Sequence, residues 1–471
     1  MNRVKEKSLK LLVGSLLLAG CGQTPDSVPR DISYQLPQSW QNTQAITPIA
    51  ADKVAQTAPL KTLPDELVEL INIALANNHD LKLAAERLKL SQADLNIASS
   101  NQLPDASIST GWNYTEALDP SQQKQFQSRQ NHKLRVSWEA DIWNKLSDLK
   151  QAANSELFAS QADYHNAQQS LIAQVIHAYL DLSLNHQLSE LLSSNLENQQ
   201  NRLKSTSKRV DLGLAKPIDL YLAQTSLHNI ETNLSTQKNR LQQSQQNLNI
   251  LLGFYPSKPL DLRLLPLDVS DFNLTLSPAD VLASRPDIKA AEMQVSAAFS
   301  RWQHSTKAYL PSFKLAAELN SSENSFKDIF NLNNWLARLA ADIAMPLFDA
   351  GQLEQIDFKN KTREQIAWLA YQKRVLAAMK EIESTLYAEY DLVERKQFIA
   401  QATSKIAAAE NLLTSQYEQG IASSSEIFNI QSRRINSEID LVRAQHAIIS
   451  NRVTLTLALA APFPLEVFPN E

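Results

Sequence analysis

Ten consecutive residues decide the fold of this chain: Lys133-Leu134-Arg135-Val136-Ser137-Trp138-Glu139-Ala140-Asp141-Ile142. Apolar and polar side chains alternate through this stretch, and a period of two indicates a β-strand with one apolar and one charged face. Beyond Asn144 the alternation stops, and apolar residues recur about every three and a half positions as far as Val210, a pattern typical of a helix with one packing seam. The stretch therefore predicts a strand followed by a long helix.

The expected length of this helix follows from the absence of proline and glycine. No proline occurs between Pro120 and Pro217, and no glycine occurs between Gly111 and Gly213. Proline breaks a helix and glycine weakens it. At about 1.5 Å per residue, a helix over residues 145–212 would be roughly 100 Å long, which a compact globular domain cannot contain. The sequence therefore predicts an elongated, mainly helical molecule with a small β part.

The composition argues against an enzyme of several globular domains. A chain of 471 residues has only 8 glycines, too few for the turn-rich surface of an ordinary α/β enzyme. The 8 histidines include no pair at the spacing of a zinc helix, and neither a phosphate-binding glycine loop nor a nucleophile elbow occurs. The formal net charge of −5 is dispersed, so nothing indicates a nucleic-acid partner. No catalytic residue and no metal site is predicted.

The only cysteine, Cys21, follows a basic start and a short apolar run that ends in Leu18-Ala19-Gly20. The run is too short to cross a bilayer, and it resembles a bacterial lipoprotein signal. That resemblance implies removal of residues 1–20 and acylation of Cys21, with the lipid as the only added group and no cofactor. A secretory signal with an incidental cysteine is the alternative. Residues 21–63 lack periodicity and are expected to form an extended acylated arm.

The second half of the chain repeats the first. Three motifs recur at one constant separation: Asp80-Leu81 as Asp287-Ile288, Leu103-Pro104 as Leu310-Pro311, and Gly213-Leu214-Ala215 as Gly420-Ile421-Ala422. Each repeat is expected to contain a helix, two strands, a long helix, a turn and a returning helix. The sequence therefore predicts a hairpin of strands and a hairpin of long helices in each half.

The expected boundaries follow from this repeat. The first repeat covers residues 64–252, with strands at about 104–116 and 132–143, a long helix to 212 and a returning helix to 252. The second repeat covers residues 280–461, with strands at about 312–320 and 335–346, a long helix to 419 and a returning helix to 461. Residues 253–279 form an equatorial connection between the repeats, and residues 462–471 form a C-terminal tail.

Four strands with alternating character are typical of an outer-membrane barrel, in which one face meets lipid and the other lines a polar lumen. A half-buried sheet on a globular core is the alternative, and a single such strand would favour it. The residues expected to line the lumen are Lys133, Arg135, Glu139, Asp141, Lys314, Glu318, Arg338 and Asp342. Four strands cannot close a barrel. The chain is therefore predicted to oligomerise, and a wide lumen favours three copies over two.

Several ordered motifs resemble one family. They are the lipoprotein signal, the two-fold repeat, Arg285-Pro286-Asp287-Ile288, a Leu-Pro before each strand pair, Trp138-Glu139-Ala140-Asp141-Ile142-Trp143, and Pro346-Leu347-Phe348-Asp349-Ala350-Gly351. Together they resemble the TolC-like outer-membrane efflux proteins, lipoprotein (NodT-type) branch. One departure is Asn144, where relatives commonly have glycine.

The resemblance implies a homotrimer in which a twelve-stranded barrel in the outer membrane continues into a periplasmic barrel of twelve helices. Such a channel would passively conduct substrates from an inner-membrane pump and a periplasmic adaptor to the exterior. Its partners would be further copies of itself, that adaptor, that pump and outer-membrane lipid. A helical scaffold or adhesin-like outer-membrane lipoprotein is the alternative, but it would not explain four alternating strands.

The turns at residues 209–217 and 417–425 lie at the far ends of the long helices. Glycine permits the left-handed residue that ends a helix, and an exposed apolar residue beside it has little use except in a contact. The residues expected to contact the adaptor at these tips are Arg209, Gly213, Leu214, Gly420 and Ile421. The candidate gate residues are Ser425, Phe428 and Asn429, the last at a position where some relatives have aspartate.

Overall fold

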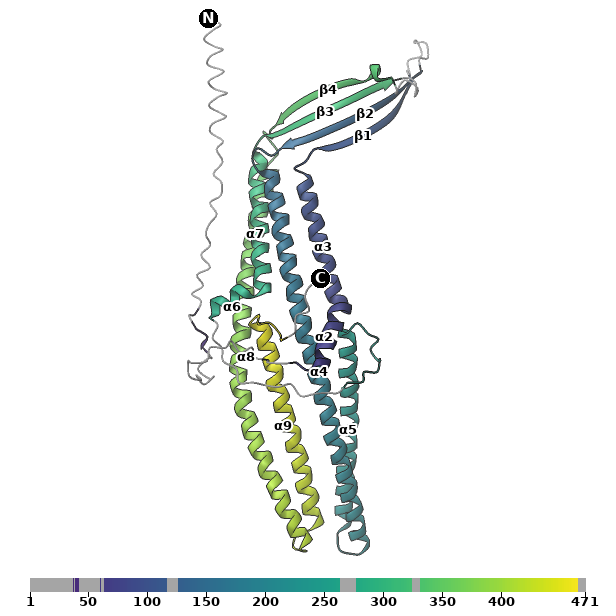
Figure 1. Cartoon of the computed structure of the whole chain (residues 1–471), viewed down its shortest axis with the longest axis vertical. Helices are drawn as coiled ribbons and strands as arrows, with labels where there is room; N and C mark the ends of the chain where they lie inside the picture. Colours follow the sequence, from purple (N-terminus) through teal and green to yellow (C-terminus); the bar gives the residue numbers. More distant parts are fainter. Residues whose placement is uncertain are drawn as a thin grey trace. The chain divides into compact units, whose positions relative to one another are not determined.

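The computed structural model describes residues 37, 39–41, 60, 63–116, 126–262, 277–323 and 331–464 (Figure 1). The helices are α2 (Asp65–Asn77), α3 (His79–Ser100), α4 (Lys145–Asp211), α5 (Pro217–Leu251), α6 (Pro278–Ser284), α7 (Pro286–Thr306), α8 (Gln352–Glu418) and α9 (Ser424–Ala458), with 3-10 helices η2 (Lys307–Tyr309) and η4 (Leu332–Asn334). The strands are β1 (Asp105–Glu116), β2 (Phe126–Ala140), β3 (Ser312–Glu323) and β4 (Leu336–Ala344). The prediction of a mostly helical chain with few strands is confirmed.

The four longest helices occur in two sizes that alternate along the chain. Helices α4 and α8 have 67 residues each, whereas α5 and α9 have 35 residues each. At about 1.5 Å per residue, 67 residues extend over roughly 100 Å. In the part of the chain that the structure describes, no helix combines the length and the apolar character that a membrane-spanning helix needs.

The chain divides into two compact units. The first, here called the strand unit, comprises the described residues within 92–156 and 294–368. The second, here called the helical unit, comprises residues 37–91, 157–293 and 369–471. The divisions fall inside α3, α4, α7 and α8, so neither unit is one continuous segment of the sequence.

In the strand unit, four strands form one antiparallel sheet in the order β1-β2-β3-β4 (Figure 1). Val136 of β2 lies opposite Ala106 of β1 and Ala317 of β3, and Ala317 in turn lies opposite Leu339 of β4. Successive side chains of a strand point to opposite faces. Most of the apolar residues therefore share one face, with Leu336 an exception, and the charged residues Arg135, Glu139, Lys314, Glu318, Arg338 and Asp342 share the other.

The second strand differs from its expected bounds. It begins at Phe126 and ends at Ala140, so Asp141 and Ile142 lie outside it. The carboxylate of Asp141 accepts hydrogen bonds from the backbone N–H groups of Leu146 (2.9 Å) and Ser147 (2.8 Å). A helix leaves its first N–H groups without partners, and a carboxylate there satisfies them. Asp141 therefore caps α4, and the expectation that it belongs to the charged strand face is wrong.

A left-handed residue stands at each junction between a strand and a long helix. Gly351 precedes α8 with φ 84°, and Asn144 precedes α4 with φ 57°. Glycine adopts this conformation without strain, and asparagine is among the few other residues that tolerate it. Asn144 therefore adopts the left-handed conformation that Gly351 has at the corresponding junction of the second repeat.

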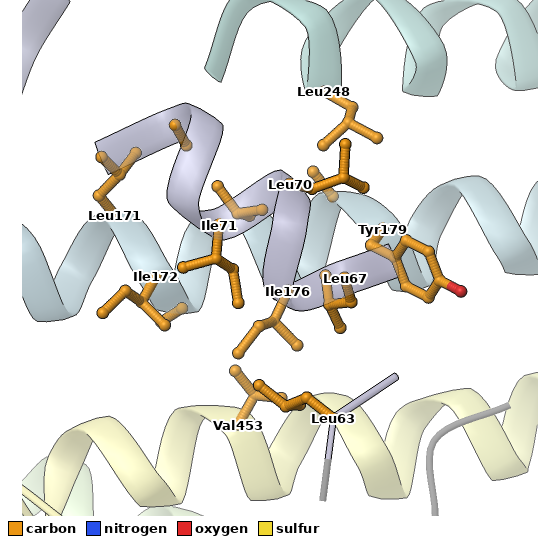
Figure 2. Packing of buried hydrophobic residues seen from close by; sticks show 14 of the residues in the cluster. Leu63, Leu67, Leu70, Ile71, Leu171, Ile172, Ile176, Tyr179, Leu248 and Val453 are labelled. Carbon is orange, nitrogen blue, oxygen red and sulfur yellow. The ribbon is translucent and has the colours of Figure 1, made fainter. Parts of the chain in front are cut away.

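The core of the helical unit forms where α2 packs against α4, with α5 and α9 on either side (Figure 2). Leu67 and Ile71 of α2, Ile176 of α4 and Leu248 of α5 are fully buried there. Complete burial of such a side chain contributes about 1.5–3 kcal/mol. Apolar packing between helices distant in sequence therefore stabilises this unit within one chain.

A residue of the expected arm packs in a second cluster. Trp40 is buried among apolar side chains of α6, α8 and α9, including Val281 and Leu386. The backbone N–H of Gln41 donates a hydrogen bond to the Glu383 carboxylate (2.9 Å). The arm is therefore attached to the helical unit at this point. Residue 21 and the signal before it lie outside the described residues.

Candidate functional site

The charged face of the sheet brings seven of the eight expected lumen residues together. Two rows cross the sheet from β2 through β3 to β4: Arg135, Glu318 and Arg338 in one, and Glu139, Lys314 and Asp342 in the other. The sign of the charge alternates along each row, and opposite charges on neighbouring strands contribute about 0.2–1 kcal/mol per pair. The seventh residue, Lys133, lies two positions from Arg135 on the same face.

Two carboxylates on this face, Glu318 and Glu139, form ion pairs. Lys133 Nζ lies 2.6 Å from the Glu318 carboxylate, and Arg135 Nε lies 3.7 Å from it. The second carboxylate, Glu139, lies 2.7 Å from Lys145 Nζ and 3.9 Å from Lys314 Nζ. Each carboxylate therefore has two cationic neighbours, and the charged face is held by ion pairs within a single chain.

The opposite face of the sheet is apolar and open. Leu339 of β4 is 87% exposed and Ile108 of β1 is 79% exposed. Trp112 and Ile343 on the same face are also exposed. Water-soluble monomers rarely expose a contiguous apolar surface of this kind, and such surfaces mark contacts with protein or membrane. The face is suited to a hydrocarbon environment.

The two helical tips have matching backbone geometry. Gly213 and Gly420 have φ 72° and 75°. The N–H of Leu214 donates to the Arg209 carbonyl oxygen (2.7 Å), and the N–H of Ile421 donates to the Gln416 carbonyl oxygen (2.8 Å). This is the hydrogen bond of a helix that ends at a left-handed glycine. The side chains of Leu214 and Ile421 are both exposed, as a contact surface requires.

The three candidate gate residues do not form one cluster. Ser425 and Asn429 are exposed on α9, whereas Phe428 is half-buried and lines a groove between α4 and α9. Asn198 of α4 donates to the Phe428 carbonyl oxygen (3.4 Å) and to Ser432 Oγ (3.2 Å). Phe428 therefore belongs to the packing between two helices, and only Ser425 and Asn429 face outward.

The sequence did not reveal the role of Arg285, which it marked only as part of a motif. Its guanidinium donates to both oxygens of Asp287 (3.0 Å each), to Glu381 of α8 (3.0 Å) and to the Ala458 carbonyl oxygen of α9 (2.6 Å). Arg285, Asp287 and Glu381 border a cavity of about 830 Å³. Hydrogen bonds to charged groups contribute about 1.5–3 kcal/mol each. Arg285 therefore ties α7, α8 and the end of α9 together.

Among the residues that the structure describes, no group of three or more His, Cys, Asp or Glu side chains is arranged to hold a metal ion. The surfaces that stand out are instead a two-faced sheet and two exposed helical tips. Such surfaces suit contact with lipid, with other copies and with partner proteins.

Comparison with known proteins supports this interpretation. A family model described as outer membrane efflux protein matches residues 70–254 and 278–461. The solvent efflux pump outer membrane protein SrpC of Pseudomonas putida is 25% identical over 466 residues, covering 94% of this chain and 97% of that protein. The probable outer membrane lipoprotein SilC of Salmonella typhimurium is 23% identical, covering 96% and 98%.

A solved structure has the same fold. The outer membrane channel CmeC of Campylobacter jejuni superposes with a TM-score of 0.79 at 19% sequence identity, covering 87% of this chain and 90% of that chain. At this identity the likeness concerns the fold.

Proposed function

Since the chain belongs to the outer membrane efflux protein family, it is an outer-membrane efflux protein, and we propose that it is the channel subunit of a tripartite pump. It would accept substrates from an inner-membrane transporter and a periplasmic adaptor and conduct them passively to the exterior. The observation that carries the proposal is the sheet, with an exposed apolar face that includes Leu339 and a charged face that includes Glu318.

The edges of the sheet support a trimer. Strands β1 and β4 lie at the two edges of the four-stranded sheet. An open edge is not tolerated in hydrocarbon, and a closed barrel needs about eight strands or more. Three copies supply twelve strands, with the apolar face toward lipid and the charged face toward the lumen. The four long helices α4, α5, α8 and α9 of each copy would then supply twelve helices of a periplasmic tunnel.

The anchor and the tips complete the proposal. Residues 1–20 would be the signal and Cys21 the acylated residue, which agrees with the name of the lipoprotein relative SilC. The exposed Leu214 and Ile421 would contact the adaptor. Ser425 and Asn429, which are exposed on α9, would narrow the closed end. Asparagine at position 429 would make that end less acidic than it is in relatives with aspartate.

Light scattering of the detergent-solubilised protein tests the central step, because it gives the mass of the protein without the detergent. We expect three chains per particle for the wild type and for a processed Cys21→Ser variant, since lipid adds an anchor but does not close the barrel. A monomer in both cases would overturn the barrel. A trimer only with the acylated cysteine would mean that the lipid, rather than the strands, holds the copies together.

A further inference from the structure

Positive charge gathers in one zone of the charged sheet face. The zone comprises Arg129, Lys133 and Arg135 of β2 and Arg338 of β4, here called the basic band. Arg135 and Arg338 lie opposite Glu318 on its two sides, and Lys133 Nζ contacts the same carboxylate at 2.6 Å. Arg129 lies farther along the same face, opposite Asn113 of β1. Three cations thus lie around a single anion, and the fourth, Arg129, lies about 20 Å from Arg135 along β2.

The single anion is also the least accessible member of the group. The side chain of Glu318 is 13% exposed, whereas those of Lys133 and Arg135 are 38% and 46% exposed. The cations therefore cover the carboxylate and keep their own charged ends accessible. An ion that approaches this face meets positive charge that Glu318 reduces but does not cancel.

The remainder of the charged face has the opposite balance. Toward the long helices it carries Asp105, Glu139 and Asp342 with one strand cation, Lys314. Lys145, from the start of α4, neutralises Glu139 at 2.7 Å. The face is therefore divided along the strands into an acidic zone next to the helices and the basic band beyond it. A uniformly mixed surface would show no such division.

We infer that the basic band makes the strand part of the channel selective for anions, so that the compounds it favours carry a carboxylate or another negatively charged group. The inference rests on the proposed function, because the band acts on permeating molecules only if the charged face lines a lumen. Rings of arginine and lysine are a known basis of anion selectivity in pores. A passage lined by one sign of charge also concentrates ions of the opposite sign.

Purified protein in planar lipid bilayers tests the inference with inorganic ions alone. Under a KCl gradient, the reversal potential gives the ratio of chloride to potassium permeability. We expect this ratio to exceed one in the wild type and to rise in Glu318→Gln. In the double variant Arg135→Gln/Arg338→Gln it should fall by at least about twofold, because a unit charge about 10 Å away in water changes the local concentration of a monovalent ion about twofold.

Lys314→Gln is the matched control, because it removes the same charge from the same face outside the basic band. It should lower the ratio less than either single substitution, Arg135→Gln or Arg338→Gln. Light scattering establishes that every variant is still a trimer. A cation-selective wild type would overturn the inference, as would a double variant with unchanged selectivity. Neither result would contradict the proposed function as a channel. A wild type that forms neither trimers nor conducting pores would overturn the proposed function, and the inference with it.

Discussion

The strand unit and the helical unit place their apolar side chains in opposite ways. In the helical unit, Leu67 and Ile176 are fully buried between helices of one chain (Figure 2). In the strand unit, Ile108 and Leu339 project from one face of the sheet and are almost fully exposed. Burial of apolar surface is the main favourable contribution to folding. One chain therefore buries an apolar core in the helical unit, whereas the strand unit leaves an apolar face exposed, as the proposed contact with lipid requires.

The ion pairs of the two units also differ in how deeply they are buried. In the strand unit, ion pairs connect side chains of neighbouring strands, as between Lys133 and Glu318. In the helical unit, Arg452 of α9 and Glu389 of α8 form a buried ion pair at 2.7 Å. Surface ion pairs contribute about 0–1 kcal/mol, whereas removing one partner of a buried pair costs about 3–5 kcal/mol. Loss of an exposed ion pair in the strand unit should therefore cost less stability than loss of the buried pair in the helical unit.

The largest effect should come from a charge on the apolar sheet face. Leu339→Arg places a cation in hydrocarbon at a cost of about 2–4 kcal/mol per chain near the bilayer midplane, and three copies multiply that cost. We expect loss of the trimer in light scattering. Arg135→Gln on the opposite face should leave the trimer intact. Equal loss in both variants would mean that the sheet does not lie in lipid with these faces.

Trp40→Ala tests whether the arm belongs to the helical unit. Truncation of a buried tryptophan costs about 3–5 kcal/mol. The thermal unfolding of the helices should shift to lower temperature, and protease should cut the arm faster near residue 40. Trp40→Phe should recover most of the stability. If Trp40→Ala left both measurements unchanged, the arm would be an independent tether.

Two isoleucine substitutions compare how much apolar side chains contribute to stability in the two units. Ile176→Ala in the helical unit should lower the free energy of unfolding by about 2–5 kcal/mol, because it leaves a cavity among packed neighbours. Ile108→Ala on the exposed sheet face should change the stability of the detergent-solubilised protein by about 0.5 kcal/mol or less. Denaturant titrations followed by circular dichroism measure both. Similar losses at the two sites would contradict the assignment of Ile108 to an exposed face.

Substitution of two glycines distinguishes the cost of backbone strain from the cost of a steric clash. Neither Gly420 nor Gly111 has an atom within 4 Å of the place where a Cβ would stand, but only Gly420 has a positive φ, at 75°. Alanine in that conformation costs about 1–2 kcal/mol. Gly420→Ala should therefore loosen the tip, seen as faster hydrogen exchange in the last turn of α8, while Gly111→Ala should not affect the sheet. Unchanged exchange at the tip would show that the turn does not depend on glycine.

The smallest effect should come from His177 in the helical unit. Burial is the largest influence on His177 and lowers its pKa below the usual 6.5. The charge of Asp181 raises this pKa, and the charge of His446 lowers it further. The ring lies 3.1 Å from Ser450 Oγ and 3.4 Å from Thr454 Oγ of α9. Because the unfolded chain then binds the proton more readily, stability should fall as the pH drops through 6.5. Unfolding midpoints measured across this range should be flatter in His177→Gln; an equal slope would assign the pH dependence to other groups.

Much of the fold could be predicted because its signals are local. Alternation along a strand and the seam of a helix depend on neighbouring residues, so the sequence around Val136 and Val210 carries them. The error at Asp141 has a local cause as well. A helix cap and the polar face of a strand both require a polar residue. The alternating pattern of polar and apolar residues therefore extends to Asp141, one residue beyond the end of β2.

The sequence by itself determined the elements, the faces of the strands and the glycines at the tips, because backbone geometry and periodicity act over a few residues. Only the tertiary structure decided which residues meet: Arg135 with Glu318 across the sheet, and Trp40 with the helices of the second half. It also separated Phe428 from Ser425, because packing against α4 half-buries one and leaves the other exposed. Such contacts join residues hundreds of positions apart, and no local pattern encodes their register.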